Sequence, residues 1–333
     1  MGHIQKHSAS DFPSELFLSL TEAIYGSQRP DKMPKQSDYH EKSYFSMEGE
    51  KAGATATVYS NSALQVDGKS VWMIGNFEAL DVDCQELFAA ITLDARAVGV
   101  DQLIGPMNGS TWQEYRFIVG QFGAPFLSEM SHPKYYSDLW KQNEFSTFQR
   151  YFSYKDSAII ANVEGISKLE QHFSFLKVTL RTIDLTSFEL ELERIYELCV
   201  RAFRKNILYS EISKEQFVAS YLPFQMWLKE DYIWIAENDQ RECIGFLFAF
   251  ENKLNPTETE LIVKTIARSP AFEYNGLGTV LGNQFMKKAI ENGVTSILHA
   301  FMHESNTSKN LSRRFNGECV RTYELLSKNL GST

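Results

Sequence analysis

The spacing of hydrophobic positions predicts alternating helices and strands along the first half of the chain. Apolar residues recur at helical intervals after Asp11 and again after Asp83, whereas the patterns over 54–60 and 71–79 are typical of strands. Between those strands, Asp67-Gly68 has the sequence of a tight hairpin turn. The first half is therefore predicted to contain helices at 11–26, 85–98 and 133–143, and strands at 54–60, 71–79, 102–105 and 145–154.

The second half repeats a comparable order of elements. Its pattern predicts helices at 190–203 and 214–221, and strands at 175–183, 232–236 and 243–250. A strand at 259–269, a glycine turn, a helix at 280–292, a strand at 296–301, a further helix and a closing strand at 315–323 follow. Because the strand signal lapses between 155 and 172, we predict two domains with this order of elements, at 1–160 and 161–333.

Composition and charge exclude several classes of partner. The 333 residues are 43% hydrophobic and 23% charged, as in a well-folded protein of two domains. Lys and Arg number 33 against 42 Asp and Glu, without a basic tract, so we expect no nucleic-acid partner. No apolar run approaches the roughly 18 residues of a membrane span, and the N-terminus lacks the apolar core of a signal peptide. Four scattered cysteines without a CxxC pair are typical of free thiols, so we expect a cytoplasmic protein.

The turn between the strand at 259–269 and the following helix indicates a phosphorylated ligand. The strand ends before Pro270, and Gly276-Leu277-Gly278 precedes the helix. A helix that begins directly after a glycine turn has free backbone N–H groups and the positive end of its dipole at that turn. Such a helix start favours an anion, most often a phosphate group. The sequence therefore predicts a cofactor that carries phosphate.

This order of elements resembles the GCN5-related N-acetyltransferase (GNAT) superfamily, whose phosphate loop reads Gln/Arg-x-x-Gly-x-Gly/Ala. The matching residues are Glu273-Tyr-Asn-Gly276-Leu-Gly278, with a glutamate where the family usually has Gln or Arg. The resemblance implies that acetyl-CoA or another acyl-CoA binds with its pantetheine arm along the strand and its pyrophosphate on the turn. The cofactor residues that it implies are Ile266, Ala267, Arg268, Glu273, Tyr274, Asn275, Gly276, Leu277, Gly278, Thr279 and Asn306.

The first half resembles a second GNAT-like domain without the phosphate loop. Its corresponding helix begins after Asp81 and Asp83, with no glycine turn, and two carboxylates there would repel a pyrophosphate. The stretch 103–109, with His132 further on, resembles a group of uncharacterised bacterial proteins with two GNAT-like halves. The expected fold is therefore α/β (α+β), with two GNAT-like domains, each a mixed, mostly antiparallel sheet flanked by helices.

Acyl transfer to an amine needs a base for the amine proton and an acid for the leaving thiolate. Glu260, on the strand that would carry the acyl group, is the candidate base, and Tyr323 is a candidate acid. Each has a structural alternative, as an exposed residue at a strand start and as a packing residue. The helix after Asn306 has Arg313 near the position where many GNAT enzymes keep a tyrosine acid.

Two further groups of side chains were weighed as sites. His299 and His303 fall on one face of a strand, followed by Glu304, but three residues across a strand end make a poor metal site, and we expect no metal. Aromatic and polar residues of the first half can line a pocket or belong to the core: Asn108, Trp112, His132, Tyr135 and Tyr136.

The resemblance implies an N-acyltransferase that moves an acyl group from acyl-CoA to the amine of a small molecule, in a cleft between the halves. One alternative is an N-acyl amino acid synthase-like enzyme, which takes long acyl chains from acyl carrier protein. A second is a non-catalytic protein that binds coenzyme A or a metabolite, which Glu273 and the missing helix tyrosine favour. A third is that the glycine turn is only structural.

Overall fold

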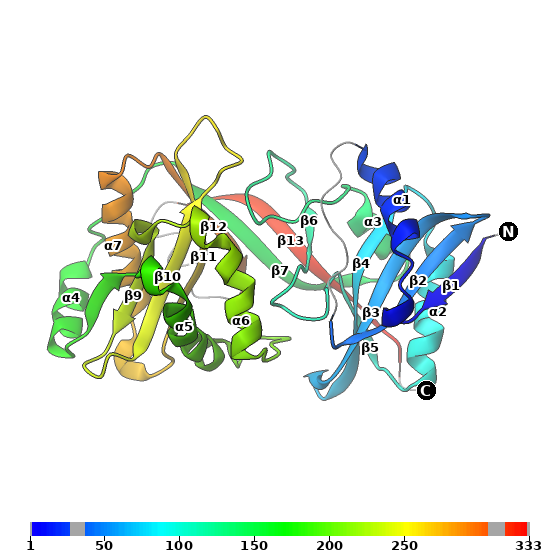
Figure 1. Cartoon of the computed structure of the whole chain (residues 1–333), viewed down its shortest axis with the longest axis horizontal. Helices are drawn as coiled ribbons and strands as arrows, with labels where there is room; N and C mark the ends of the chain where they lie inside the picture. The colour runs from blue at the N-terminus through cyan, green and yellow to red at the C-terminus, as the bar shows by residue number, and fades with distance from the viewer. Residues whose placement is uncertain (1, 27–36, 306–316, 332–333) are drawn as a thin grey trace.

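One continuous mixed sheet organises the fold in the computed structural model, which describes residues 2–26, 37–305 and 317–331 (Figure 1). Its thirteen strands follow the order β1-β2-β3-β4-β5-β13-β7-β12-β11-β10-β9-β8, with β6 beside β13. Neighbours are antiparallel except for the pairs β4–β5 and β11–β12. The strands are β1 (His3–His7), β2 (His40–Glu48), β3 (Lys51–Val66), β4 (Lys69–Ala79), β5 (Gln102–Gly105), β6 (Phe117–Val119), β7 (Ser146–Asp156), β8 (Thr179–Thr182), β9 (Ile233–Glu237), β10 (Cys243–Glu251), β11 (Glu260–Arg268), β12 (Ser296–His303) and β13 (Glu318–Asn329).

Helices cover both faces of the sheet in each half. In the first half, α2 and α3 pack on one face, and α1 contributes Phe17 and Leu20 to a separate cluster. In the second half, α4 and α7 share one core and α5 and α6 another. The helices are α1 (Ser14–Tyr25), α2 (Gln85–Ala97), α3 (Tyr136–Gln142), α4 (Ile166–Phe175), α5 (Phe188–Phe203), α6 (Lys214–Tyr221) and α7 (Leu277–Glu291). This arrangement confirms the expected α/β (α+β) class.

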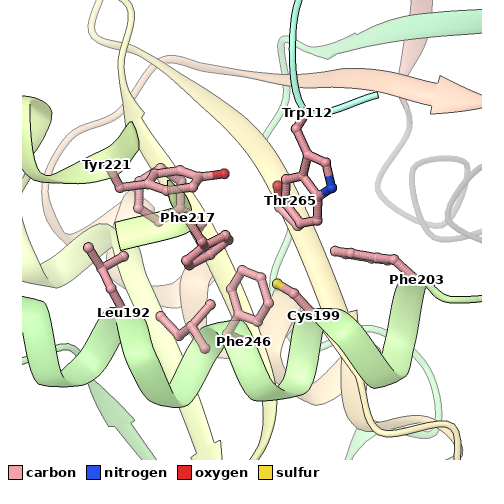
Figure 2. A pocket seen from close by; sticks show the side chains of 10 residues that line it. Trp112, Leu192, Cys199, Phe203, Phe217, Tyr221, Phe246 and Thr265 are labelled. Carbon is pink, nitrogen blue, oxygen red and sulfur yellow. The ribbon is translucent and has the colours of Figure 1, made fainter. Parts of the chain in front are cut away.

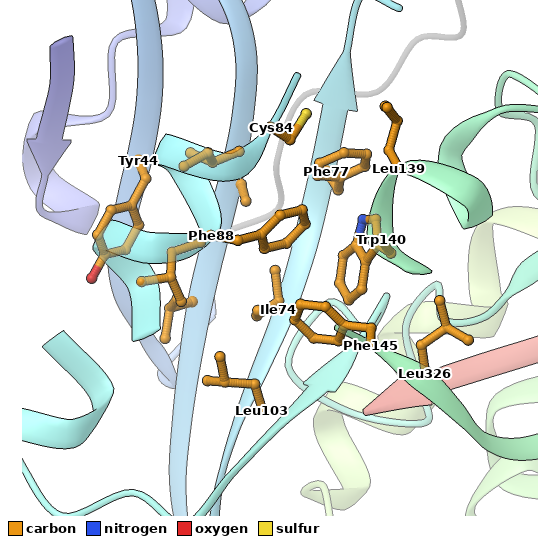
Figure 3. Packing of buried hydrophobic residues seen from close by; sticks show 14 of the residues in the cluster. Tyr44, Ile74, Phe77, Cys84, Phe88, Leu103, Leu139, Trp140, Phe145 and Leu326 are labelled. Atoms are coloured by element: carbon orange, nitrogen blue, oxygen red, sulfur yellow. The ribbon is translucent and has the colours of Figure 1, made fainter. Parts of the chain in front are cut away.

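Aromatic side chains fill the core of the first half. Phe88 of α2 and Trp140 of α3 have ring centroids 5.2 Å apart, and Phe77 of β4 lies 5.5 Å from the Trp140 ring (Figure 3). Leu326 of the C-terminal strand β13 belongs to the same cluster and is fully buried. The end of the chain is therefore part of the core of the first half.

Two long strands join the halves at the middle of the sheet. β7 pairs with β12 of the second half, and β13 pairs with both β7 and β5 (Figure 1). The chain thus completes the second half before its last strand returns to the first. The domain limits 1–160 and 161–333 stay a prediction, with β7 and β13 as shared elements.

Local sequence signals explain most of these elements. The predicted hairpin turn forms, with φ of 52° at Asp67 and 76° at Gly68, as a tight β-hairpin requires. The Asp83 carboxylate accepts a hydrogen bond from the Gln85 N–H (2.8 Å) just before α2, whose N-cap is Cys84. The helix α4 was not predicted, although its apolar positions have helical spacing.

Two further findings concern membrane-spanning helices and the state of the cysteines. No helix among the described residues is long and apolar enough to cross a membrane. All four cysteines are free thiols in the structure.

Candidate active site

The two central strands of the second half separate after a short parallel pairing. β11 and β12 pair only from Glu260↔Ser296 to Val263↔His299. Beyond that point β11 continues to Arg268 along β10, whereas β12 pairs with β7. From 264 to 268, one edge of β11 therefore has no ladder partner among the described strands. An unpaired strand edge offers N–H and C=O groups to an extended ligand.

A β-bulge lies where the strands diverge. In the pairing of β10 with β11, Phe248 is opposite Thr265 and Ala249 is opposite Val263, so Lys264 is the extra residue. A bulge leaves the backbone of its extra residue outside the ladder, and bulges are frequent beside active sites. The bulge therefore offers a backbone donor of the kind that stabilises an oxyanion during acyl transfer.

The glycine turn leads directly into the helix α7, which begins at Leu277, three residues before the predicted start at 280. Gly276 is the N-cap with a φ of 93°, and a Cβ built there would lie 2.7 Å from Cδ2 of Leu169 in α4. At Gly278 a Cβ would lie 3.6 Å from Ile266, which is ordinary contact. Gly276 is thus required both for its backbone conformation and for the close approach of α4.

Three consecutive N–H groups at this turn remain available for a ligand. The N–H of Asn275 donates to the Phe272 carbonyl and that of Thr279 to the Gly276 carbonyl. The N–H groups of Gly276, Leu277 and Gly278 have no acceptor in the part of the chain that the structure describes. Together with the dipole of the 15-residue helix α7, they form a site suited to a phosphate anion.

The other predicted cofactor residues surround this turn. Arg268 Nη2 donates to Asn275 Oδ1 (2.5 Å), and its Nη1 donates to the Ser269 carbonyl (2.7 Å). The side chain of Glu273 is exposed, while its carbonyl is 3.0 Å from Nε2 of His172 in α4. The Arg268 guanidinium therefore adds a positive charge beside the turn, and Glu273 can point away from it. Tyr274 packs against the core shared by α4 and α7, and Asn306 and Arg313 lie outside the described residues.

Glu260 is a buried, ion-paired carboxylate at the start of β11. It is 5% exposed and lies 2.7 Å from Nζ of Lys155, with hydrogen bonds from Asn252 (2.6 Å) and Ser296 (3.1 Å). Burial acts to raise the pKa of this carboxyl, but hydrogen bonds from Lys155 and Asn252 and the charge of Lys155 outweigh it, so the pKa lies below its usual value. Four residues of strand, about 13 Å, separate Glu260 from the bulge at Lys264.

Tyr323 lies in the middle of the sheet with its hydroxyl in a polar network. The side chain is 1% exposed, and the hydroxyl donates to Glu129 Oε1 (2.7 Å) and lies 3.0 Å from Ser153 Oγ. Burial and the charge of Glu129 raise the pKa of the hydroxyl, so it stays protonated at neutral pH. The Tyr323 ring is 5.3 Å from that of Phe301, just beyond the point where β12 leaves β11.

The two predicted catalytic residues are not neighbours. Ile297, next to the partner of Glu260, pairs with Asp156 of β7, whereas Tyr323 pairs with Tyr151. Those positions are five residues apart on β7, or about 17 Å along the strand. Tyr323 therefore lies near the divergence of β11 and β12, and Glu260 at the opposite end of β11.

Residues absent from the sequence prediction gather around Tyr323. Arg116, from the irregular segment after β5, places its guanidinium carbon 4.4 Å from the Phe301 ring centroid, and Lys264 Nζ is 4.9 Å from the same ring. Glu129, whose pKa is raised by burial, pairs with Arg321 (3.2 Å). Lys264 had a signal in the sequence, since it interrupts an apolar strand. Arg116 had none, because its segment shows no periodic pattern.

A small apolar cavity of about 50 Å³ lies on the α5 side of β10 and β11. Figure 2 shows Trp112 reaching in from a loop of the first half above the side chains of α5, with Thr265 of β11 beside it. The indole N–H of Trp112 donates to the Ser210 carbonyl (2.7 Å), which fixes the ring. Of the five first-half residues weighed as pocket-lining, Trp112 lines this cavity, and Tyr136 is fully buried in the aromatic core.

The two histidines of β12 that the sequence offered as metal ligands each contact a residue of β7. His299 Nε2 lies 2.8 Å from Asp156 Oδ2, and His303 Nε2 lies 2.6 Å from Gln149 Oε1. Each histidine thus has its own partner on β7. Within the described residues, no group of three or more His, Cys, Asp or Glu side chains is arranged to hold a metal ion.

Solved structures that share this arrangement include GNAT proteins. A tandem GNAT protein from the clavulanic acid biosynthesis pathway matches over 100% of both chains, with a TM-score of 0.53 and 10% identity. A GCN5-related N-acetyltransferase from Anabaena variabilis (99% of this chain, 73% of the other, TM-score 0.55, 7% identity) and Eis1 from Mycobacterium abscessus (99% and 74%, 0.52, 10%) are also similar. The sequence itself matches no family model and no curated protein. The GNAT fold in tandem that the sequence predicted is thereby confirmed.

Proposed function

From the premise that this chain has the tandem GNAT fold, we propose that its second half binds an acyl-CoA and transfers the acyl group to the amine of a small molecule. The observation that carries the proposal is the combination of three free N–H groups at the start of α7 with the open edge of β11. The first suits a pyrophosphate and the second an extended pantetheine arm.

The pantetheine arm would lie along Ile266, Ala267 and Arg268, and its pyrophosphate on the N–H groups of Gly276, Leu277 and Gly278. In that orientation the thioester would reach the bulge, where a backbone N–H polarises its carbonyl. When bound, the cofactor supplies an activated acyl group, and the chain orients it and stabilises the oxyanion. No metal takes part in this proposal.

Proton transfer is assigned to the two residues predicted from the sequence. Tyr323, which its raised pKa keeps protonated and whose ring lies near Phe301 at the divergence, would donate a proton to the departing thiolate once its hydroxyl is released from Glu129. Glu260 would take the amine proton only along a chain of several waters, because about 13 Å of strand separates it from the bulge. Its lowered pKa keeps it ionised at neutral pH, as a base must be.

Calorimetry and thermal unfolding with acetyl-CoA, free coenzyme A and a long-chain acyl-CoA test the cofactor. Ligand at about 100 times its dissociation constant should add roughly 2.7 kcal/mol, or several degrees in Tm. Gly278→Glu should weaken binding at least tenfold, because its carboxylate faces the pyrophosphate at the helix start. Gly278→Ala is the matched control, since a methyl group has room there. Equal affinity of the Glu variant and the wild type would exclude the turn as the phosphate site.

A non-catalytic coenzyme A-binding protein is the second candidate function. It is favoured by the saturated contacts of Glu260 and Tyr323, whose polar atoms already have protein partners. Release of free thiol from acetyl-CoA in the presence of an amine pool separates the two functions, because only an enzyme produces it. If a long-chain acyl donor on acyl carrier protein is preferred, the chain is an N-acyl amino acid synthase-like enzyme instead.

A further inference from the structure

Arg116 is a buried cation enclosed by aromatic rings at the junction of the two halves. It is 8% exposed, and its guanidinium carbon lies 3.9 Å from the Tyr115 ring centroid and 4.6 Å from that of Tyr151. Its Nε donates to the Tyr115 carbonyl, whereas Nη1 is buried without a hydrogen-bond partner. Buried charged donors are costly unless an acceptor satisfies them. An acceptor for Nη1 is therefore missing from the described part of the chain.

Lys264 is a second cation at the same place. Its Nζ lies 4.9 Å from the Phe301 ring centroid, and the Arg116 guanidinium carbon lies 4.4 Å from that centroid. Its Nζ donates a long hydrogen bond to Ser128 Oγ (3.4 Å). Burial and the charge of Arg116 lower the pKa of Lys264 to about 8, and the charge of Glu114 offsets part of this effect. The fold thus holds two cations close enough to repel one another.

Two other cations on the central strands have carboxylate partners. Arg321 pairs with Glu129 (3.2 Å) and Lys155 with Glu260 (2.7 Å). Neither Arg116 nor Lys264 forms a salt bridge with a carboxylate in the described segments. Since folding alone would favour pairing or replacing such charges, the pair indicates an anion that comes from outside the chain.

The position of this pair separates it from the cofactor phosphates. Lys264 is the bulge residue at which β11 leaves β12, and Phe301 is the facing residue on β12. Arg268, beside the phosphate turn, is four residues further along β11, or about 13 Å. The two cations are therefore at the end of the open edge where a thioester would lie, and not at the turn.

We propose that Arg116 and Lys264 bind a carboxylate of the acceptor, so that the acceptor is a small amine that also carries an acid group, as an amino acid does. The guanidinium fork matches a carboxylate in a planar, bidentate geometry, and the ammonium adds a point charge. The surrounding rings cover the buried Arg116 guanidinium and strengthen its contacts. This inference rests on the proposed acyl transfer for its site, but the anion binding itself needs no turnover.

A panel of amino acids, with the carboxamide of each member, tests the proposal by calorimetry on the full-length protein, with and without coenzyme A. At least one amino acid should bind ten or more times as tightly as its carboxamide. Initial acylation rates from acetyl-CoA should show the same preference in KM. Lys264→Met and Arg116→Gln should each reduce the preference at least tenfold, and Arg116→Gln should leave acetyl-CoA affinity unchanged. Lys134→Met is the matched control, because this exposed lysine lies 5.2 Å from the Phe122 ring centroid.

The outcomes separate this inference from the proposed function. Tight binding of amino acids to a protein that binds no acyl-CoA supports the anion site and removes the acyltransferase function. Acylation of amides and amino acids at equal efficiency, or no binding by any member of the panel, overturns the inference. A preference that survives in Lys264→Met and Arg116→Gln overturns it as well. If Arg116→Gln does not fold, Lys264→Met decides alone.

Discussion

At the scale of single residues, the buried charges of this protein fall into two groups. Glu260 and Lys155 form a pair 2.7 Å apart that links β11 to β7. Arg116 and Lys264 have no carboxylate partner among the described residues, and both contact the Phe301 ring. Paired charges hold neighbouring strands in register, whereas unpaired ones reduce stability and are typical of functional sites.

Glu260→Gln is expected to destabilise the fold by about 1–3 kcal/mol, because Lys155 loses the charge that accompanies its burial. The folded-state pKa of Glu260 is lowered, so its contribution is present above the unfolded value near 4.3 and is lost as pH falls through the folded value. The difference in the free energy of unfolding between variant and wild type should therefore be fully present at pH 7 and become smaller at acidic pH. Urea unfolding of the variant and the wild type at pH 7 and at acidic pH measures this difference. An equal difference at the two pH values would contradict the ion pair.

The same variant tests Glu260 as the base. Loss of a general base lowers kcat about 10²–10⁴-fold and removes the acidic limb of the pH–rate profile. A kcat within tenfold of the wild type, with the limb retained, would leave Glu260 with a structural role only.

At the scale of elements, the start of α7 and the end of β11 form the most constrained part of the candidate site. Gly276 combines a φ of 93° with the approach of Leu169 from α4, and Gly278 faces Ile266 of β11. The two glycines therefore differ in what they require. The first fixes the path of the backbone, and the second leaves space above the strand that would carry the cofactor.

Gly276→Ala should destabilise the protein by about 1–3 kcal/mol, because its Cβ is strained at positive φ and would lie 2.7 Å from Leu169. Gly278→Ala should change stability by less than about 1 kcal/mol, since its Cβ makes ordinary contact. Thermal unfolding of the two variants compares them directly. Equal losses would contradict the role of the Gly276 conformation. Gly276 is accordingly a poor site for a binding test, and Gly278→Glu serves better.

At the scale of the whole molecule, β7 and β13 make the two halves depend on each other. β13 belongs to the last part of the chain but pairs with β5, and its Leu326 lies in the aromatic core of the first half. β7 belongs to the first half but pairs with β12. Because each half lacks part of its sheet without the other, we expect the chain to unfold as one cooperative unit.

Leu326→Ala should cost about 2–5 kcal/mol, as for other fully buried leucines. Its effect should reach both halves, so that amide exchange in α7 and in α2 accelerates together, and a single unfolding transition shifts to lower temperature. Leu254→Ala, at a leucine that is 54% exposed, is the control and should have little effect. Faster exchange in α2 alone would show that the halves unfold independently.

The sequence determined those features that depend on neighbouring residues. Asp67-Gly68 forms the predicted turn because both residues tolerate positive φ, and Gly276 begins α7 for the same reason. The strand β11 and its helix were recognised because period and glycine spacing are local signals. These local signals predicted the order of elements and the candidate phosphate turn, whereas the expected fold came from the resemblance to the GNAT superfamily.

The tertiary structure decided which distant residues meet. Only the pairing of β13 with β7 brings Tyr323 next to Ser153, and only the segment after β5 brings Arg116 to Phe301. Such contacts depend on strand order and burial, which have no period in the sequence. For the same reason Glu260, chosen for its place on β11, proved to be ion-paired with Lys155 of another strand, and the unpaired cations became visible only in the folded protein.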